Sequence, residues 1–142
     1  MTPSEAIAVL LDADSDTTDM RGDRYFGTMQ LIEEGTVLPY QVCSEITTGF
    51  NHHLTGNGGI ASRSLQLDHF GFTEAQVVTL ADAARKKLDA FRGVVSDTGA
   101  TDLTIRSLRI QDEASGQTVP DAAQASGVSR IRQEYLMTFL LA

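Results

Sequence analysis

One continuous stretch, residues 61–94, changes its hydrophobic period in the middle, and it constrains the fold more than any other part of the chain. Residues 63–70 alternate between apolar and polar side chains as a β-strand does, and Gly71 interrupts the alternation. From Thr73 onward the apolar residues recur at spacings of three and four, which predicts an amphipathic helix closed by Gly93. Its apolar stripe consists of Val77, Ala81, Ala84, Leu88 and Phe91.

The segments on either side predict one further helix and four further strands. Thr2, Pro3 and Glu5 form a capping-box start for a helix that ends near Asp12. The Asp-, Ser- and Thr-rich run over residues 14–19 predicts a solvated exit from that helix, because these side chains compete for backbone hydrogen bonds. The predicted strands cover residues 24–27, 39–46, 103–111 and 129–140. A change of apolar phase predicts a bulge near residues 106–107.

This order of elements predicts an α+β fold. We expect a small mixed or antiparallel sheet, packed by one long amphipathic helix plus a short N-terminal helix. A length of 142 residues predicts one domain spanning residues 1–142. Two extended loops, residues 47–59 and 114–127, are not explained by a core, and they are therefore candidates for contacts with partners.

The charge of the chain is uneven. Its net charge is −8, and residues 1–71 hold three arginines against ten acidic residues. Because neutralising phosphates requires Lys and Arg, such a chain is not expected to wrap nucleic acid. It has no apolar run near the length of a membrane span, which predicts no membrane partner. The single cysteine, Cys43, excludes an internal disulfide and is expected to be a packed strand residue.

Two groups of residues suggest metal binding or acid–base chemistry. Residues 12–23 begin with alternating aspartates like a calcium loop, but Thr17 stands where the turn needs Gly and Asp23 where the loop needs Glu. The pair Asp68 and His69 points to opposite faces of a strand, as adjacent residues do. We therefore predict no catalytic residue, no cofactor site and no metal site, and a small metal-binding or hydrolytic domain remains the least favoured alternative.

A basic cluster marks the end of the second helix, at Arg85, Lys86 and Lys87 with Arg92 nearby. Cations at this position complement the helix dipole. Alternatively, they contact the acidic N-terminal half of a neighbouring subunit. The candidate interaction residues are these three helix cations together with polar residues of the two loops, namely Asn51, His52, His53, Asn57, Ser115, Gln117 and Gln124.

Taken together, the segments resemble the tail-terminator (tail-completion) family of long-tailed phages and gene transfer agents. The resemblance covers nearly the whole chain and rests on the order and spacing of several short patterns. They are Ile7-x-x-Leu10-Leu11, Arg24-Tyr25, Leu38-Pro39-Tyr40-Gln41-Val42, Ala61-x-Arg63-x-Leu65-Gln66-Leu67-Asp68, Leu88-x-x-Phe91-Arg92-Gly93, Ile105-x-x-Leu108-x-Ile110-x-Asp112-Glu113 and Arg132-x-x-Tyr135-x-x-x-Phe139. The acidic residues 14–23 and the pair His52-His53 depart from the typical family pattern.

The resemblance implies a structural virion protein and not an enzyme. Members form a homo-oligomeric ring, expected to be a hexamer, that caps the tail tube and stops its polymerisation. The implied partners are the tail tube protein and the head–tail connector or neck protein. The protein would be assembled in the host cytoplasm and would reside at the neck-proximal end of the tail. An acidic lumen would let DNA pass without specific binding.

Two other readings of the sequence stay open at this stage. The chain could instead be another phage neck or head-closure component, which sequence separates poorly from a terminator. It could also be a generic α+β interaction domain of some other assembly, which would share the fold and form no ring.

Overall fold

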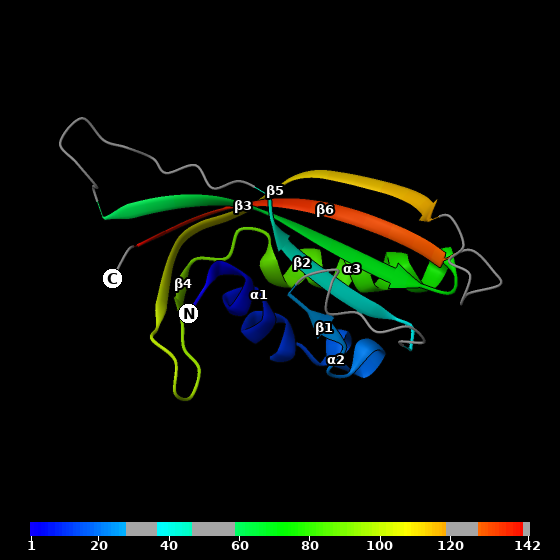
Figure 1. The fold of residues 1–142 in the computed structure, drawn as a ribbon, viewed down its shortest axis with the longest axis horizontal. Helices are drawn as coiled ribbons and strands as arrows, with labels where there is room; N and C mark the ends of the chain where they lie inside the picture. The colour runs from blue at the N-terminus through cyan, green and yellow to red at the C-terminus, as the bar shows by residue number, and fades with distance from the viewer. Residues whose placement is uncertain (28–36, 47–58, 119–127, 141–142) are drawn as a thin grey trace.

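The computed structural model describes residues 1–27, 37–46, 59–118 and 128–140. Within these ranges the chain forms three helices and six strands in a mixed α+β arrangement. The helices are α1 (Pro3–Asp12), α2 (Ser15–Arg21) and α3 (Glu74–Leu88). The strands are β1 (Tyr25–Phe26), β2 (Tyr40–Glu45), β3 (Ile60–Gly71), β4 (Gly93–Val95), β5 (Leu103–Thr118) and β6 (Val128–Leu140). All three helices lie on one side of a curved sheet (Figure 1), which gives the two layers expected of this class.

The sheet has the strand order β1-β2-β3-β6-β5-β4 among the described residues. Only the β1–β2 pair is parallel. β3 and β6 form its centre, paired from Ile60↔Leu140 to Gly71↔Ser129. β4 was not predicted, because it is three residues long and follows a helix directly. It pairs only with the start of β5, so no described strand covers the later part of that edge.

The N-terminal helices confirm one prediction and correct another. α1 begins with the predicted capping box: Thr2 Oγ1 accepts from Glu5 N, and Thr2 N donates to the Glu5 carboxylate. The expected solvated exit is wrong, since residues 15–21 form a second helix. Asp14 caps this helix by accepting hydrogen bonds from the backbone N and Oγ1 of Thr17. Burial of Thr17 and Arg21 gives α2 a stability that helix propensity alone does not supply.

The junction between β3 and α3 follows from its sequence. A Cβ atom on Gly71 would lie 2.8 Å from Val77 Cγ2, so only glycine lets the helix approach the strand this closely. Thr73 then caps α3 by accepting from Gln76 N. The predicted stripe is buried from Val77 to Leu88, but the helix ends at Leu88 and not at residues 91–93. It ends there because the next residues turn away, with Ala90 at φ 66°.

β5 changes phase twice, and each change has a register shift. The predicted bulge near residues 106–107 is confirmed by the shift between Ile105 and Ser107. A second shift, between Ile110 and Asp112, returns the strand to its original phase. The residues opposite the inward-facing side of β6 are therefore Ile105, Leu108, Ile110, Glu113 and Ser115.

The two predicted loops meet different outcomes. Residues 114–118 belong to β5, so the prediction of a loop beginning at residue 114 is wrong there. Pairing with β6 extends to Thr118↔Val128, and this cross-strand pairing overrides the low strand propensity of the Ala-, Ser- and Gly-containing segment. Residues 119–127 and 47–58 lie outside the described residues, and Gly59 precedes β3 with φ 71°.

Apolar side chains are buried on both faces of the sheet. The main core lies between the helices and the sheet, and includes Ile7, Leu11 and Leu88 from the helices. On the opposite face, an aromatic cluster centres on Tyr40 stacked against Phe70 at 4.9 Å. Cys43 is buried in the main core as expected, whereas Ile46, just beyond the end of β2, is exposed.

Candidate interaction surface

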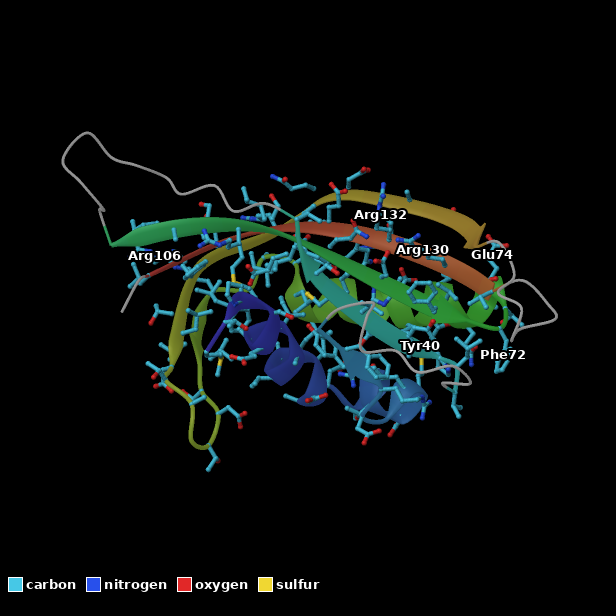
Figure 2. All side chains as sticks on the ribbon, in the orientation of Figure 1. Tyr40, Phe72, Glu74, Arg106, Arg130 and Arg132 are labelled. Atoms are coloured by element: carbon cyan, nitrogen blue, oxygen red, sulfur yellow. The ribbon has the colours of Figure 1, made fainter. Side chains whose placement is uncertain are left out.

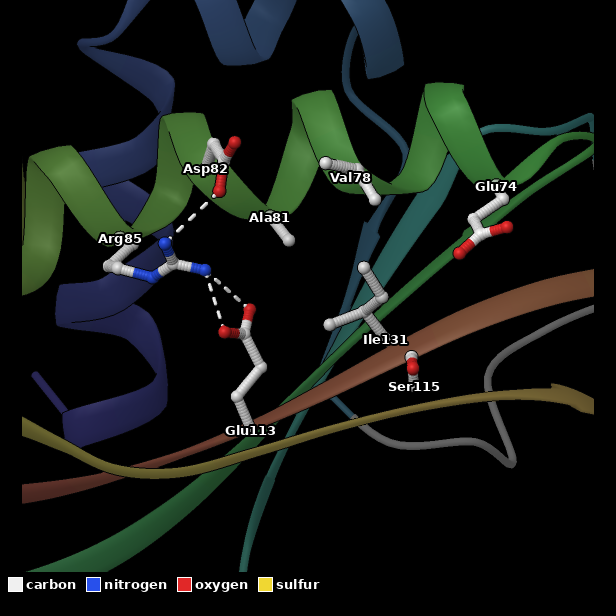
Figure 3. A pocket seen from close by; sticks show the side chains of 8 residues that line it. All are labelled: Glu74, Val78, Ala81, Asp82, Arg85, Glu113, Ser115 and Ile131. Atoms are coloured by element: carbon white, nitrogen blue, oxygen red, sulfur yellow. Dashed lines mark hydrogen bonds and ion pairs between the residues drawn. The ribbon is translucent and has the colours of Figure 1, made fainter.

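An open groove of about 300 Å³ lies between the exposed side of α3 and the strands β5 and β6 (Figure 3). We call it the α3/β5 groove. Its lining consists of Glu74, Val78, Ala81, Asp82 and Arg85 from α3, Glu113 and Ser115 from β5, and Ile131 from β6. The α3 residues share one side of the helix because they recur at helical spacing. Glu113 reaches the groove because the second β5 register shift turns it toward α3.

Arg85 joins the two walls of the groove at one end. Its Nη2 donates to both carboxylate oxygens of Glu113 at 2.6 and 2.7 Å, and its Nη1 lies 3.1 Å from Asp82 Oδ1. Burial raises the pKa of Glu113, but hydrogen bonds from Arg85 and Gln133 outweigh it and hold that pKa below its ordinary value. The hydrogen bond with Glu113 likewise raises the pKa of Arg85. Arg85, which the sequence analysis grouped with Lys86 and Lys87, is therefore engaged in ion pairs within its own chain.

Beneath this ion pair, a buried hydrogen-bond chain runs into the sheet. Gln133 Nε2 donates to Glu113 Oε1 and to the Ala81 carbonyl oxygen, both at 3.1 Å. Its Oε1 consequently accepts, at 2.8 Å from His69 Nε2 and 3.0 Å from the Tyr135 hydroxyl. The fixed amide orientation assigns the proton of His69 to Nε2, so Nδ1 accepts from Gln41 Nε2 at 3.0 Å. Glu113 is thereby held on its buried side by Gln133, whose amide is itself fixed by hydrogen bonds to Ala81, His69 and Tyr135.

Burial also decides the ionisation of the His69 and Tyr135 side chains in this hydrogen-bond network. His69 is fully buried, which lowers its pKa from 6.5 to about 4 and keeps the ring neutral near pH 7. Burial raises the pKa of Tyr135 above its ordinary value. A neutral imidazole that both donates and accepts fits the two amides on either side, so both ring nitrogens of His69 are satisfied without a charge, while Gln41 Oε1 is buried with no hydrogen-bond partner among the described residues.

A second charged surface lies at the C-terminal end of α3. Lys86, Lys87 and Arg92, which we call the basic end of α3, have no ionic partner among the residues that the structure describes. Lys86 and Arg92 are exposed and Lys87 is half-buried. The basic end of α3 lies where the sequence analysis placed the basic cluster, but Arg85 lines the α3/β5 groove instead.

The structure places the predicted interaction residues unevenly. Ser115 lines the α3/β5 groove, and Gln117 follows it by one strand period on β5. The remaining predicted loop residues, Asn51, His52, His53, Asn57 and Gln124, lie outside the described residues. The sequence analysis missed Glu74, Val78, Asp82, Glu113 and Ile131 as groove residues. Only the i, i+4, i+8 spacing of the first three was visible in the sequence as a signal.

The acidic segment that resembles a calcium loop uses its first carboxylates elsewhere. Asp12 Oδ1 accepts from Arg21 Nη2 at 2.7 Å, and Asp14 caps α2. Because residues 15–21 are helical, the alternate side chains cannot converge around one ion as a calcium loop requires. Across the described part of the chain, no three His, Cys, Asp or Glu side chains are placed to hold a metal.

The other residues considered for chemistry have structural partners. Asp68 accepts from Arg130 Nε and Nη2 at 2.9 and 2.8 Å, on the face opposite His69. Arg130 also lies 5.5 Å from the centre of the Phe70 ring, and Figure 2 labels this arginine beside Arg132 on the sheet. Burial raises the pKa of the Cys43 thiol to about 11, which disfavours the nucleophilic thiolate. None of the helices in the described ranges is long and apolar enough to cross a membrane.

Comparison with known proteins finds similarity at the level of structure. No protein-family model matches the sequence, and no curated protein sequence matches it. Among solved structures, the chain is similar to a chain of one described as "Virion of native gene transfer agent (GTA) particle". The match has a TM-score of 0.68 at 13% sequence identity, and it covers 97% of this chain and 94% of that chain. This chain therefore shares its fold, over nearly its whole length, with a chain of that particle.

Proposed function

We propose that this protein is a structural virion subunit that closes into a ring on the end of a phage-type tail tube. The ring, expected to be a hexamer, stops tube polymerisation and carries the joint to the head connector or neck protein. The protein acts by assembly and not by catalysis. It resides at the neck-proximal end of the tail after assembly in the host cytoplasm.

The observation that carries this proposal is the full-length structural likeness to a chain of a gene transfer agent virion. The likeness spans nearly the whole of both chains, so it is not a shared motif within a larger unrelated protein. It agrees with the independent resemblance of the sequence patterns to tail terminators. Two comparisons of different kinds thus favour the same class of particle.

The surfaces of the subunit suit a ring. A head-to-tail ring requires two unlike patches on each subunit, and α3 carries an acidic groove along one side and a basic cluster at its C-terminal end. The net charge of −8 is compatible with a lumen through which DNA passes without adhering. Acidic side chains found only on the outside of the ring would contradict that lumen.

Native mass spectrometry of the purified chain, with and without the tail tube subunit from the same genome, tests the proposal. We expect a closed ring, either alone or on addition of the tube subunit. A chain that stays monomeric in both conditions would overturn the proposal and favour a generic interaction domain.

Deleting the gene in a particle-producing host separates a terminator from another neck component. Loss of a terminator should give tails of uncontrolled length. Loss of a head-closure or neck component should instead leave tails of normal length that fail to join heads. Tail lengths measured by electron microscopy decide between the two.

A further inference from the structure

The two ends of α3 differ in both charge and shape. The α3/β5 groove runs along α3 from Glu74 to Arg85, and it holds three carboxylates against the single guanidinium of Arg85. The basic end holds Lys86 and Lys87 in the last turn of α3 and Arg92 just beyond it, while the nearby Asp89 accepts a hydrogen bond from Ile110 N. The groove is concave, whereas Lys86 and Arg92 are exposed and Lys87 is half-buried, so the groove can receive a side chain that the basic end extends.

These two surfaces cannot meet within one subunit. Glu74 and Lys87 are 13 positions apart on one helix, which separates them by about 20 Å along its axis. Complementary charges fixed at opposite ends of a rigid element can pair only between copies. Such a pairing is heterologous, and it closes a ring when the rotation between copies allows it.

The open part of the groove fits a long cationic side chain. Glu74 is exposed and has no ionic partner among the described residues, whereas Asp82 and Glu113 share Arg85. Val78 is 40% exposed, although it is apolar and lies one helical turn from Glu74. Figure 3 shows Val78 and Ile131 between Glu74 and the Arg85–Glu113 pair. A lysine stem can therefore pack on apolar surface while its ammonium group reaches a carboxylate.

The far end of the groove is held in place before any partner arrives. Glu113 is fixed by Arg85 on one side and by buried Gln133 on the other. Groups that are already ordered lose less conformational entropy on binding than free surface side chains do. The carboxylates exposed on α2, such as Asp16 and Asp19, do not line this groove and form no ion pair among the described residues.

We propose that the α3/β5 groove of one copy binds the basic end of α3 from the next copy. Glu74 pairs with the incoming Lys86 or Lys87, and Val78 and Ile131 contact its aliphatic stem. This contact rests on the proposed ring and names the surfaces that build it. The sequence analysis placed the acidic partner of these cations in the N-terminal half of a neighbouring subunit. The present proposal places it in the α3/β5 groove instead.

Two charge-reversed chains test the contact. One carries Glu74→Lys and Asp82→Lys, which makes its groove basic. The other carries Lys86→Glu and Lys87→Glu, which makes its projecting end acidic. In each chain alone, every contact between copies pairs like charges. In a 1:1 mixture, every contact between unlike chains pairs opposite charges, so the mixture should assemble where neither chain does.

The measurement is native mass spectrometry of each chain and of the mixture, under the conditions in which the wild-type ring forms. We expect each variant alone to associate at least about tenfold more weakly than wild type, and the mixture to recover alternating assemblies. Recovery also shows that both variants are folded. Matched controls with the same change in net charge are Asp16→Lys with Asp19→Lys, and Arg106→Glu with Arg109→Glu. Both should assemble as wild type does.

The outcomes separate this contact from the ring itself. A wild-type ring that both charge-reversed chains also form would overturn the contact and leave the ring standing. Loss of the ring in both variants without recovery in the mixture would also count against the contact. A wild-type chain that never assembles would overturn the proposed function, and the contact with it.

Discussion

The α1–α2 connection and the α3/β5 groove are both acidic, but they use their carboxylates in opposite ways. In the first region, Asp12 compensates the buried Arg21 and Asp14 caps a helix. In the second, carboxylates from α3 and β5 converge on one hollow, and Glu74 keeps no ionic partner among the described residues. A dense run of acidic residues therefore indicates local structure here, while the proposed binding surface lies where separate elements bring charges together.

The largest expected effect lies in the first region. Replacing Asp12 with Ala removes the anion beside a guanidinium that is 0% exposed, so the buried charge of Arg21 loses its compensation. Because the Asp12 side chain is itself 58% exposed, water partly replaces it, and the free energy of unfolding should fall by about 2 to 3 kcal/mol. Chemical denaturation measures this loss. The exposed Asp16→Ala serves as the control and should change stability by no more than about 0.5 kcal/mol. Equal losses in the two variants would refute the assigned role of Asp12.

The folding stability should depend on pH because of His69, which belongs to the buried hydrogen-bond network beneath the groove. Below about pH 6.5 the unfolded chain protonates His69, while the folded chain resists protonation until about pH 4. Stability is therefore complete above pH 6.5 and falls as the pH decreases, with a loss attributable to His69 of about 2 kcal/mol between pH 7 and pH 5. Urea denaturation at the two pH values measures the loss. In His69→Gln that share of the slope should disappear, and an unchanged slope would assign it to other groups.

A smaller effect is expected at the cap of α2. Asp14→Ala removes the side chain that accepts from Thr17 N and Oγ1, and losing such a cap costs about 1 kcal/mol. The neighbouring Ser15→Ala, at the first helical position, should cost less. Neither change should affect association of the subunits, because α2 is not part of the proposed contact. Thermal unfolding and native mass spectrometry together check both statements.

The smallest effect on stability is expected in the groove itself. Glu113→Gln weakens the ion pair with Arg85, whose two side chains are 39% and 34% exposed. Partly exposed pairs contribute little, so the loss should stay below about 1 kcal/mol. The same variant should weaken association measurably, since it removes a groove charge. A large stability loss with unchanged association would reverse the contrast between the two acidic regions.

The parts of the fold that the sequence predicted are those decided by neighbouring residues. The β3–α3 unit, the Thr2 and Thr73 caps and the first bulge of β5 depend on local periodicity and on single side chains. The helix α2 was missed because Asp, Ser and Thr have low helix propensity, and burial of Arg21 overrides it. β4 was missed because three residues carry too little pattern.

The groove was beyond prediction for a different reason. Its walls come from residues 74–85, 113–115 and 131, and the contact between them depends on how β5 is registered against β6. The pairing of Arg85 with Glu113 crosses 28 positions, and nothing local in the sequence announces it. The basic end of α3 is visible in the sequence because Lys86 and Lys87 are adjacent and Arg92 lies near them, whereas the ion pairs that engage Arg85 are not.

In the proposed contact, the position of Glu113 depends on how β5 is registered against β6 and not on the number of residues in the strand. Between Ile110 and Asp112 the strand carries one extra residue, Gln111, and the shift around it leaves Glu113 opposite Gln133, on the face toward α3. We therefore expect an in-frame deletion of Gln111 to remove the bulge and to keep Glu113 opposite Gln133. Two related genes that differ by this one codon would encode strands of different length that present the same carboxylate to the groove.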